Sequence, residues 1–160
     1  MSNFTSDFTN MLLADNPDEQ ILKNFDYVCS YIPELKPMQG FDQHNPYHTY
    51  DVLNHTMIVL KSTPIDLTLR LSALFHDVAK PICYTMDSKG IGHFYNHPIK
   101  GRDLTSKILN RLDYQQDLIT DVLTLIEYHD YPLHLQEKSI KKLLNRINIK
   151  LIDKLMTLKR

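Results

Sequence analysis

The sequence predicts an all-α protein, and three observations lead to that class. Only four glycines and eight prolines interrupt 160 residues, so few positions favour turns. Apolar residues recur at helical rather than alternating spacing in most segments. Residues of β type flank Asp-Ser-Lys-Gly within residues 83–94, where we expect a small β-hairpin or an irregular loop. We expect one domain over residues 1–160, because this length and a hydrophobic content of 42% suffice for a single core.

Residues 1–38 are expected to form a helical scaffold. A first helix near residues 4–13 should end before Pro17. A second helix over residues 18–31 begins with two acidic side chains, which favour a helix N-terminus, and prolines follow its end. We interpret both helices as structural.

Residues 40–160 are expected to form the core of the domain. The polar, aromatic segment 40–50 is interrupted by a proline, which predicts an ordered loop before a helix at residues 51–60. Asp66 can start the next helix. An apolar stripe with the i, i+4, i+7 spacing of a buried face predicts that this helix continues to Val78. The stripe consists of Leu67, Leu71, Leu74 and Val78.

The C-terminal half predicts further helices. Pro98 favours the first helical position and opens a helix to about residue 112, with His97 directly before it. Apolar positions from residue 118 onward carry the next helix to His129, and Pro132 ends that region. Residues 139–160 have the pattern of one or two amphipathic helices.

Charge and cysteine content limit the classes of protein to which this chain can belong. With 18 basic and 19 acidic residues the net charge is near zero, so no global field favours nucleic acid or an acidic membrane surface. Cys29 and Cys83 lie far apart without a pairing signature, and the N-terminus lacks the features of a signal peptide. Every apolar run is too short to span a bilayer. We therefore expect a cytoplasmic protein that does not bind membranes.

The doublet His76-Asp77 is the most informative feature, because it places two potential metal ligands at the end of an apolar, helical run. A carboxylate on a buried helix requires a cation or strong hydrogen bonds. Three further histidines, His55, His97 and His129, also lie on apolar helix faces or at helix ends. A single histidine in such a place is more often a hydrogen-bonded core residue, and for His97 a helix-capping role competes. Their joint occurrence favours a metal site.

This set of imidazoles and one carboxylate suits Mn, Fe, Co, Ni or Zn, and it has enough ligands for two ions or for one ion with open positions. Such a site can activate water and bind a phosphoryl oxygen, which points to phosphoester hydrolysis. We therefore assign His55, His76, Asp77, His97 and His129 as metal ligands, with Asp77 also catalytic. Lys80, three residues after Asp77, is a catalytic candidate because it can neutralise charge on the phosphate.

Other polar residues are candidates for substrate contacts. His48 and His93 either face the substrate or are exposed loop histidines. Arg102 either contacts a phosphate or belongs to the ordinary surface. Basic residues greatly outnumber acidic ones between residues 138 and 160, so these C-terminal helices can attract RNA or nucleotide phosphate, although such a run is more often a solvated helix face.

At these residues the chain resembles the HD-domain metal-dependent phosphohydrolases, through His55, the doublet His76-Asp77 and Lys80-Pro81. Residues 44–56 and 92–97 make the HD region of bacterial CCA-adding tRNA nucleotidyltransferases the closest likeness, in register over about residues 40–160. The nucleotidyltransferase head of that family has no counterpart here, so we expect a free-standing HD domain.

The resemblance implies an all-α HD-domain helical bundle that binds one or two divalent ions, Mg among the possible metals. It also implies phosphatase, 2′-nucleotidase or 2′,3′-cyclic phosphodiesterase activity. Many members carry a last ligand aspartate in a C-terminal helix that has no match here, and Asp130 and Asp153 are the possible substitutes.

Two functions are open at this point. The first is an enzyme that hydrolyses a nucleotide or an RNA-end phosphoester. The second is a catalytically silent module that has kept the fold to bind RNA or a protein partner, which the missing aspartate would permit.

Overall fold

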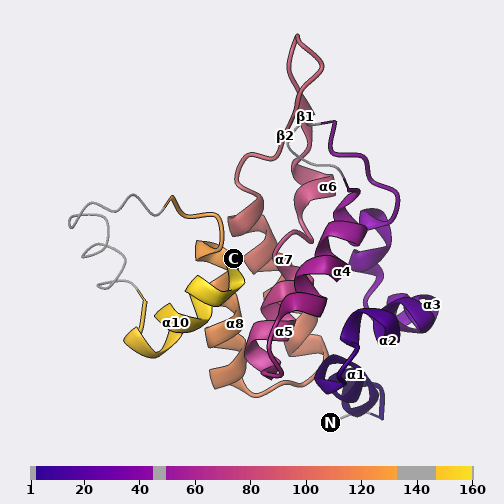
Figure 1. The fold of residues 1–160 in the computed structure, drawn as a ribbon, viewed down its shortest axis with the longest axis vertical. Helices are drawn as coiled ribbons and strands as arrows, with labels where there is room; N and C mark the ends of the chain where they lie inside the picture. Colours follow the sequence, from indigo (N-terminus) through magenta and orange to yellow (C-terminus); the bar gives the residue numbers. More distant parts are fainter. Residues whose placement is uncertain (1–2, 45–49, 133–146, 160) are drawn as a thin grey trace.

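Helices make up nearly all of the regular structure in the computed structural model, which describes residues 3–44, 50–132 and 147–159 (Figure 1). The N-terminal elements are α1 (Asn3–Leu13), α2 (Pro17–Lys23), α3 (Phe25–Tyr31) and the 3-10 helix η1 (Pro33–Met38). The core elements are α4 (Val52–Ser62), α5 (Leu67–Phe75), α6 (Lys80–Cys83), β1 (Thr85–Met86), β2 (Gly92–His93), α7 (His97–Arg111), α8 (Gln116–Tyr128) and α10 (Ile149–Leu158). The predicted all-α class is confirmed.

The predicted helix over residues 18–31 is wrong in one respect, because Asn24 divides it into α2 and α3. The backbone of Asn24 leaves the helical region, with φ −109° and ψ 21°. Its side-chain amide donates a hydrogen bond of 2.8 Å to the carbonyl of Gln20. Short polar side chains compete in this way with helical hydrogen bonding, so they interrupt a helix even where the apolar spacing continues.

Helix α5 also ends earlier than predicted. It stops at Phe75 rather than Val78, and the chain then makes tight turns until α6. The amides of Val78 and Lys80 donate to carbonyls three residues back, at 3.2 and 3.0 Å. Pro81 favours such a break because it has no amide hydrogen to donate to the carbonyl of Asp77, whereas it is tolerated in the first turn of α6. His76 and Asp77 therefore lie in the first turn after α5 rather than on a continuous helix.

The remaining predicted elements are confirmed where the structure describes them. Aspartates cap two helices, because Asp51 accepts a hydrogen bond from the Asn54 amide and Asp66 accepts one from the Leu69 amide. The predicted hairpin is present, with β1 antiparallel to β2 and Thr85 opposite His93. Residues 45–49 of the predicted loop and residues 139–146 of the predicted C-terminal helices lie outside the described residues.

Helix α5 lies at the centre of the fold, packed against α4 on one side and α8 on the other. Helix α7 packs along α8, and α10 covers α8 and α5 on the side opposite the N-terminal helices (Figure 1). A core of buried side chains from α1 to α8 fills the interior. The hairpin projects from one end of this bundle.

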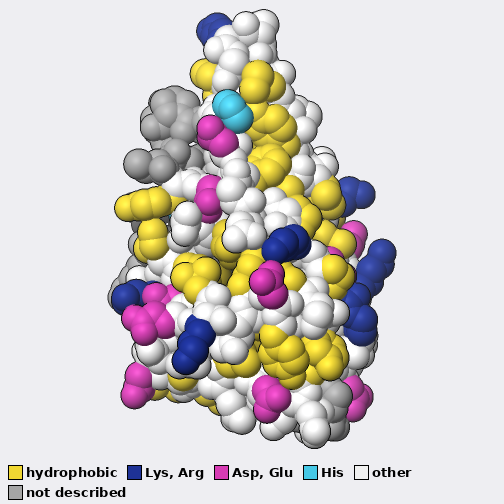
Figure 2. Space-filling view, turned by 90° about the vertical axis from the view of Figure 1, so that its right-hand side faces the viewer, with side chains coloured by type: hydrophobic (Ala, Val, Ile, Leu, Met, Phe, Trp, Pro, Cys, Tyr) yellow, Lys and Arg dark blue, Asp and Glu magenta, His cyan; other side chains and the backbone are white. Residues whose placement is uncertain are grey.

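Acidic and basic side chains are mixed with exposed hydrophobic ones over the face shown in Figure 2, in keeping with the near-zero net charge. The described helices include none with the length and apolar character needed to cross a membrane.

Arg70 joins the N-terminal scaffold to the core. Its side chain is 3% exposed and donates to four backbone carbonyls rather than to a carboxylate. Its Nη1 group donates to the carbonyls of Leu12 and Ala14 at the C-terminal end of α1, and its Nε group donates to those of Thr63 and Pro64 after α4. One guanidinium thus satisfies carbonyls at the ends of two helices.

Replacing Arg70 with Met is expected to destabilise the protein by about 2–4 kcal/mol, because buried carbonyls lose their donors. The control is Arg111→Met, since Arg111 pairs with Glu34 near the surface and should contribute less than about 1 kcal/mol. Urea unfolding measures both. Equal destabilisation by the two variants would contradict this role for Arg70.

Helix α10 is held to α5 by an ion pair at the α5 N-cap. Lys154 donates to both carboxylate oxygens of Asp66, at 2.8 and 2.7 Å. Burial alone raises the pKa of Asp66, but the bonds from Lys154 and the Leu69 amide outweigh it, so the pKa lies below its ordinary value.

A carboxyl with a lowered folded-state pKa stabilises the fold above its unfolded pKa of about 3.9. That contribution is lost as the pH falls through the folded value. Asp66→Asn keeps a capping side chain but removes the charge, so we expect it to cost less than about 1 kcal/mol at pH 6. The difference from wild type in urea unfolding should shrink at pH 3. A difference that stays constant between pH 6 and pH 3 would exclude a role for the ion pair.

Candidate metal centre

Four elements deliver the polar side chains that surround Asp77. His55 comes from the middle of α4, and His76 precedes Asp77 in the turn after α5. His97 is the first residue of α7, and His129 is the C-cap of α8. Because α4, α7 and α8 all pack near the end of α5, histidines far apart in the sequence meet at one carboxylate.

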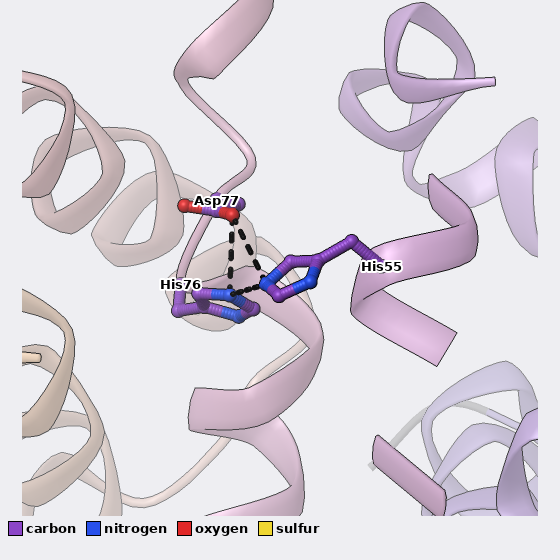
Figure 3. A group of neighbouring side chains, drawn as sticks. All are labelled: His55, His76 and Asp77. Atoms are coloured by element: carbon purple, nitrogen blue, oxygen red, sulfur yellow. Dashed lines mark hydrogen bonds and ion pairs between the residues drawn. The ribbon is translucent and has the colours of Figure 1, made fainter. Parts of the chain in front are cut away.

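One pair of histidines faces the Oδ2 atom of Asp77. The Nε2 atom of His76 lies 3.2 Å from Oδ2, and the Nε2 atom of His55 lies 3.7 Å from it. The two Nε2 atoms are 3.4 Å apart. Figure 3 shows both rings turned toward the carboxylate, with His55 reaching across from α4.

A second pair faces the other carboxylate oxygen. The Nε2 atoms of His97 and His129 lie 3.4 and 3.8 Å from Oδ1 of Asp77. They are 3.3 Å from each other. Asp77 therefore presents one oxygen to each pair of imidazoles, and the two sets of possible ligands share this single carboxylate.

Backbone contacts fix the tautomers of three rings. The Nδ1 atoms of His76, His97 and His129 lie 2.7 to 2.9 Å from the carbonyl oxygens of the residues three positions earlier. A carbonyl oxygen only accepts, so each Nδ1 carries the proton. A neutral ring then directs the lone pair of Nε2 at the centre, which is the arrangement that metal-ligating histidines usually have.

The geometry fits divalent metal ions. Two ligands bound at about 2.1 Å to one tetrahedral ion are roughly 3.4 Å apart. The Nε2–Nε2 distances of 3.4 Å for His55 and His76 and 3.3 Å for His97 and His129 match this separation. Two lone pairs facing each other at this distance repel unless a proton or a cation lies between them, so the donor set suits ions of the N/O-binding class.

The electrostatics of the centre also favour cations. Asp77 is 2% exposed, which alone would raise its pKa, yet the surrounding His76, His97 and Lys80 hold its pKa well below the ordinary value. The carboxylate is therefore charged although it is buried. Burial, followed by the nearby His76, lowers the pKa of His129 to about 3, so His129 is neutral at pH 7 and its Nε2 lone pair is available.

His76 differs from His129. Burial lowers its pKa, but the adjacent Asp77 carboxylate outweighs burial and raises it. A metal ion at His76 therefore competes with a proton, and binding would release that proton.

Lys80 holds the carboxylate from the side. Its Nζ atom lies 2.9 Å from Oδ2 of Asp77 and donates to Oε1 of Gln43 at 2.9 Å. It also lies 5.2 Å from the centre of the Phe94 ring. The lysine is 5% exposed, so the geometry supports a role in orienting Asp77. Its predicted role at the phosphate stays a prediction.

The centre lies in a cavity of about 640 Å³, within the range of small-molecule sites. His93, a predicted substrate residue, lines this cavity, and its Nε2 donates to Asp87 at 3.1 Å. Asp130 also lines it. Asp153 is exposed on α10 and is not among the described residues that line the cavity.

The structure does not bring Arg102 to the cavity. Its guanidinium binds Glu127 at 2.8 Å and Asp103 at 2.9 Å. The predicted contact of Arg102 with substrate stays a prediction that the geometry does not support. His48 and residues 138–146 of the basic C-terminal segment lie outside the described residues.

Sequence reasoning did not assign Gln43 to the site, and it included Lys159 only within the basic segment 138–160. Gln43, 1% exposed, fixes Lys80 and donates to the carbonyl of Tyr50 at 3.0 Å. Lys159 lines the cavity and donates to the carbonyls of His129 and Tyr131 at 2.7 and 2.8 Å. It thus satisfies the C-terminal carbonyls of α8, where a cation is favoured.

Two imidazole pairs that share one buried carboxylate define a candidate binuclear metal centre in an all-α domain. The HD domain family model matches residues 47–158, and the chain therefore belongs to the HD-domain family. The predicted family is confirmed.

The chain is similar to two curated tRNA nucleotidyltransferases. It is 29% identical over 121 residues to an A-adding tRNA nucleotidyltransferase of Deinococcus radiodurans, covering 72% of this chain and 28% of that protein. It is 27% identical over 130 residues to a CC-adding tRNA nucleotidyltransferase of Thermus thermophilus, covering 77% of this chain and 30% of that protein. The chain thus spans less than a third of the length of these relatives.

Single substitutions should separate the two ligand sets. Asp77→Ala is expected to weaken the binding of both ions by more than about 100-fold, because each set loses its carboxylate oxygen. His55→Ala and His129→Ala should each remove one ion and retain the other. Calorimetric titration of the metal-free protein with Mn²⁺ or Zn²⁺ measures the stoichiometry.

The matched control is His44→Ala, because His44 lies near Asp42 and outside both ligand sets. It should leave the stoichiometry unchanged. Unaltered metal binding by folded Asp77→Ala would refute the assignment.

Proposed function

We propose that this protein is a divalent-metal-dependent phosphohydrolase that acts on a nucleotide or an RNA-end phosphoester. The observation that carries the proposal is the buried Asp77 carboxylate, which presents one oxygen to each of two imidazole pairs at an open cavity. Sites with two neighbouring ions are a recurrent solution for phosphoester hydrolysis.

The residues around Asp77 would have different roles in metal binding and positioning. His55 and His76 would hold one ion, and His97 and His129 would hold the other, with Asp77 shared between them. Bound divalent ions supply Lewis acidity toward a phosphoryl oxygen and increase the acidity of water. Lys80 fixes the carboxylate in the orientation that both pairs require. Gln43 in turn fixes Lys80.

Two observations support the substrate class. The named relatives are tRNA nucleotidyltransferases, and membership of the HD-domain family supports phosphoester chemistry. The cavity is of small-molecule size, which suits a mononucleotide or the end of an RNA strand better than the side of a duplex. Phosphatase, 2′-nucleotidase and 2′,3′-cyclic phosphodiesterase activities are all compatible with this centre.

The test is a panel of phosphoesters: 2′,3′-cyclic nucleotides, nucleoside 2′- and 5′-monophosphates and an aryl phosphate, each with Mn²⁺, Co²⁺, Ni²⁺, Mg²⁺ or Zn²⁺. We expect metal-dependent turnover of at least one nucleotide substrate. Asp77→Ala should lower kcat/KM by at least about 100-fold, because metal binding and orientation are both lost. Product release measured by chromatography identifies the bond that is cleaved.

Asp153→Ala is the matched control, since it removes an exposed carboxylate on α10. It should retain wild-type activity. A folded, metal-loaded protein without turnover on the whole panel would overturn the proposal. That outcome would favour a silent module that binds RNA or a protein partner.

A further inference from the structure

A pair of stacked rings, one half-buried and one exposed, lies at the same cavity as the metal centre. The rings of His93 and Tyr95 are nearly parallel, with an interplanar angle of 10° and centroids 5.4 Å apart. Both residues line the cavity. Tyr95 is 69% exposed, so most of its ring surface faces solvent rather than the core. The assignment of Asp77 and the histidines leaves this pair without a role.

The hairpin fixes the ring of His93. His93 donates through Nε2 to the Asp87 carboxylate at 3.1 Å. The same carboxylate accepts the backbone amides of Lys89 and Ile91, each at 2.9 Å, and so organises the turn between β1 and β2. The His93 ring is therefore fixed before any ligand binds, which reduces the entropy lost on binding.

The backbone also keeps Tyr95 close to the metal centre. Tyr95 is two residues before His97, so their Cα atoms are at most about 7 Å apart. Between them, Asn96 adopts a left-handed conformation with φ 61° and ψ 15°, and its side chain makes no cap hydrogen bond to α7. Asn96 also lines the cavity, where its amide offers both a donor and an acceptor.

A preorganised, exposed aromatic face suits a flat, polarisable ligand group. Nucleobases stack on such faces with little dependence on sequence, because every base has a π surface. A phosphate at the metal centre and a base on Tyr95 would be joined by the sugar of one nucleotide.

We propose that His93 and Tyr95 form a base-stacking platform, which makes a nucleoside phosphate the substrate class of this centre. Only one part of this inference rests on the proposed function, namely that the phosphate of the nucleotide binds at the metal centre. Tyr95 contacts the base, and His93 positions Tyr95 by stacking on the other face of its ring. Asn96 lies where it can read an edge of the base.

The test compares ligands that share some groups and lack others. Adenosine, AMP and ribose 5-phosphate are titrated calorimetrically into the Mn²⁺-loaded protein. We expect AMP to bind roughly 10-fold more tightly than ribose 5-phosphate, because only AMP stacks. Tyr95→Ala should abolish that preference and the binding of adenosine, whereas Tyr95→Phe should keep both.

Tyr31→Ala is the matched control. Tyr31 is also exposed and stacked on an aromatic ring, that of Phe4, but it does not line the cavity. It should keep the preference for AMP. His93→Ala should weaken the preference without altering the affinity for ribose 5-phosphate.

The outcomes separate this inference from the proposed function. Equal affinities for AMP and ribose 5-phosphate, a preference unchanged in Tyr95→Ala, or no binding of adenosine and AMP would each overturn the platform. If adenosine binds through Tyr95 but the phosphate adds no affinity, the platform stands and the phosphohydrolase proposal loses its support.

Discussion

The fold depends on one buried charge. Asp77 is almost fully enclosed, and an ionised carboxylate in that position is costly unless cations or donors surround it. Helices α4, α7 and α8 and the turn after α5 each direct a side chain at it, and Lys80 completes the shell. The packing of the bundle thus also brings the residues of the centre together. The same interactions that compensate the buried charge arrange imidazole lone pairs around two sides of it.

The early end of α5 makes this arrangement possible. On a continuous helix, successive side chains diverge by about 100°, so His76 and Asp77 would face different neighbours. The tight turn before Pro81 instead leaves the His76 ring 3.2 Å from the Asp77 carboxylate, while Lys80 reaches the same carboxylate from the start of α6.

Local patterns predicted most of the fold, because helical periodicity and helix ends are encoded over a few residues. His97 and His129 could be chosen as candidates since each lies at a helix end marked by proline or by the loss of apolar spacing, and the structure places both near Asp77. The division at Asn24 was not predicted, because it depends on a side-chain hydrogen bond that competes with apolar spacing. Gln43 and the cavity position of Lys159 were not predicted for a different reason. Their partners are 37 and about 30 residues away, and no local pattern encodes such pairs.

Gly92 allows strand β2 to pack closely against the Gln43–His44 segment at the cavity. Its amide donates to the carbonyl of His44 at 2.8 Å, and a Cβ atom there would lie 2.1 Å from the carbonyl oxygen of Gln43. The β2 strand can approach the Gln43 loop only because this residue has no side chain. Gln43 contacts Lys80, and Lys80 contacts Asp77. A chain of contacts therefore links the hairpin that carries His93 to the lysine that orients the carboxylate. A side chain at residue 92 would therefore displace the Gln43 loop and, with it, the contact that positions Lys80 beside Asp77.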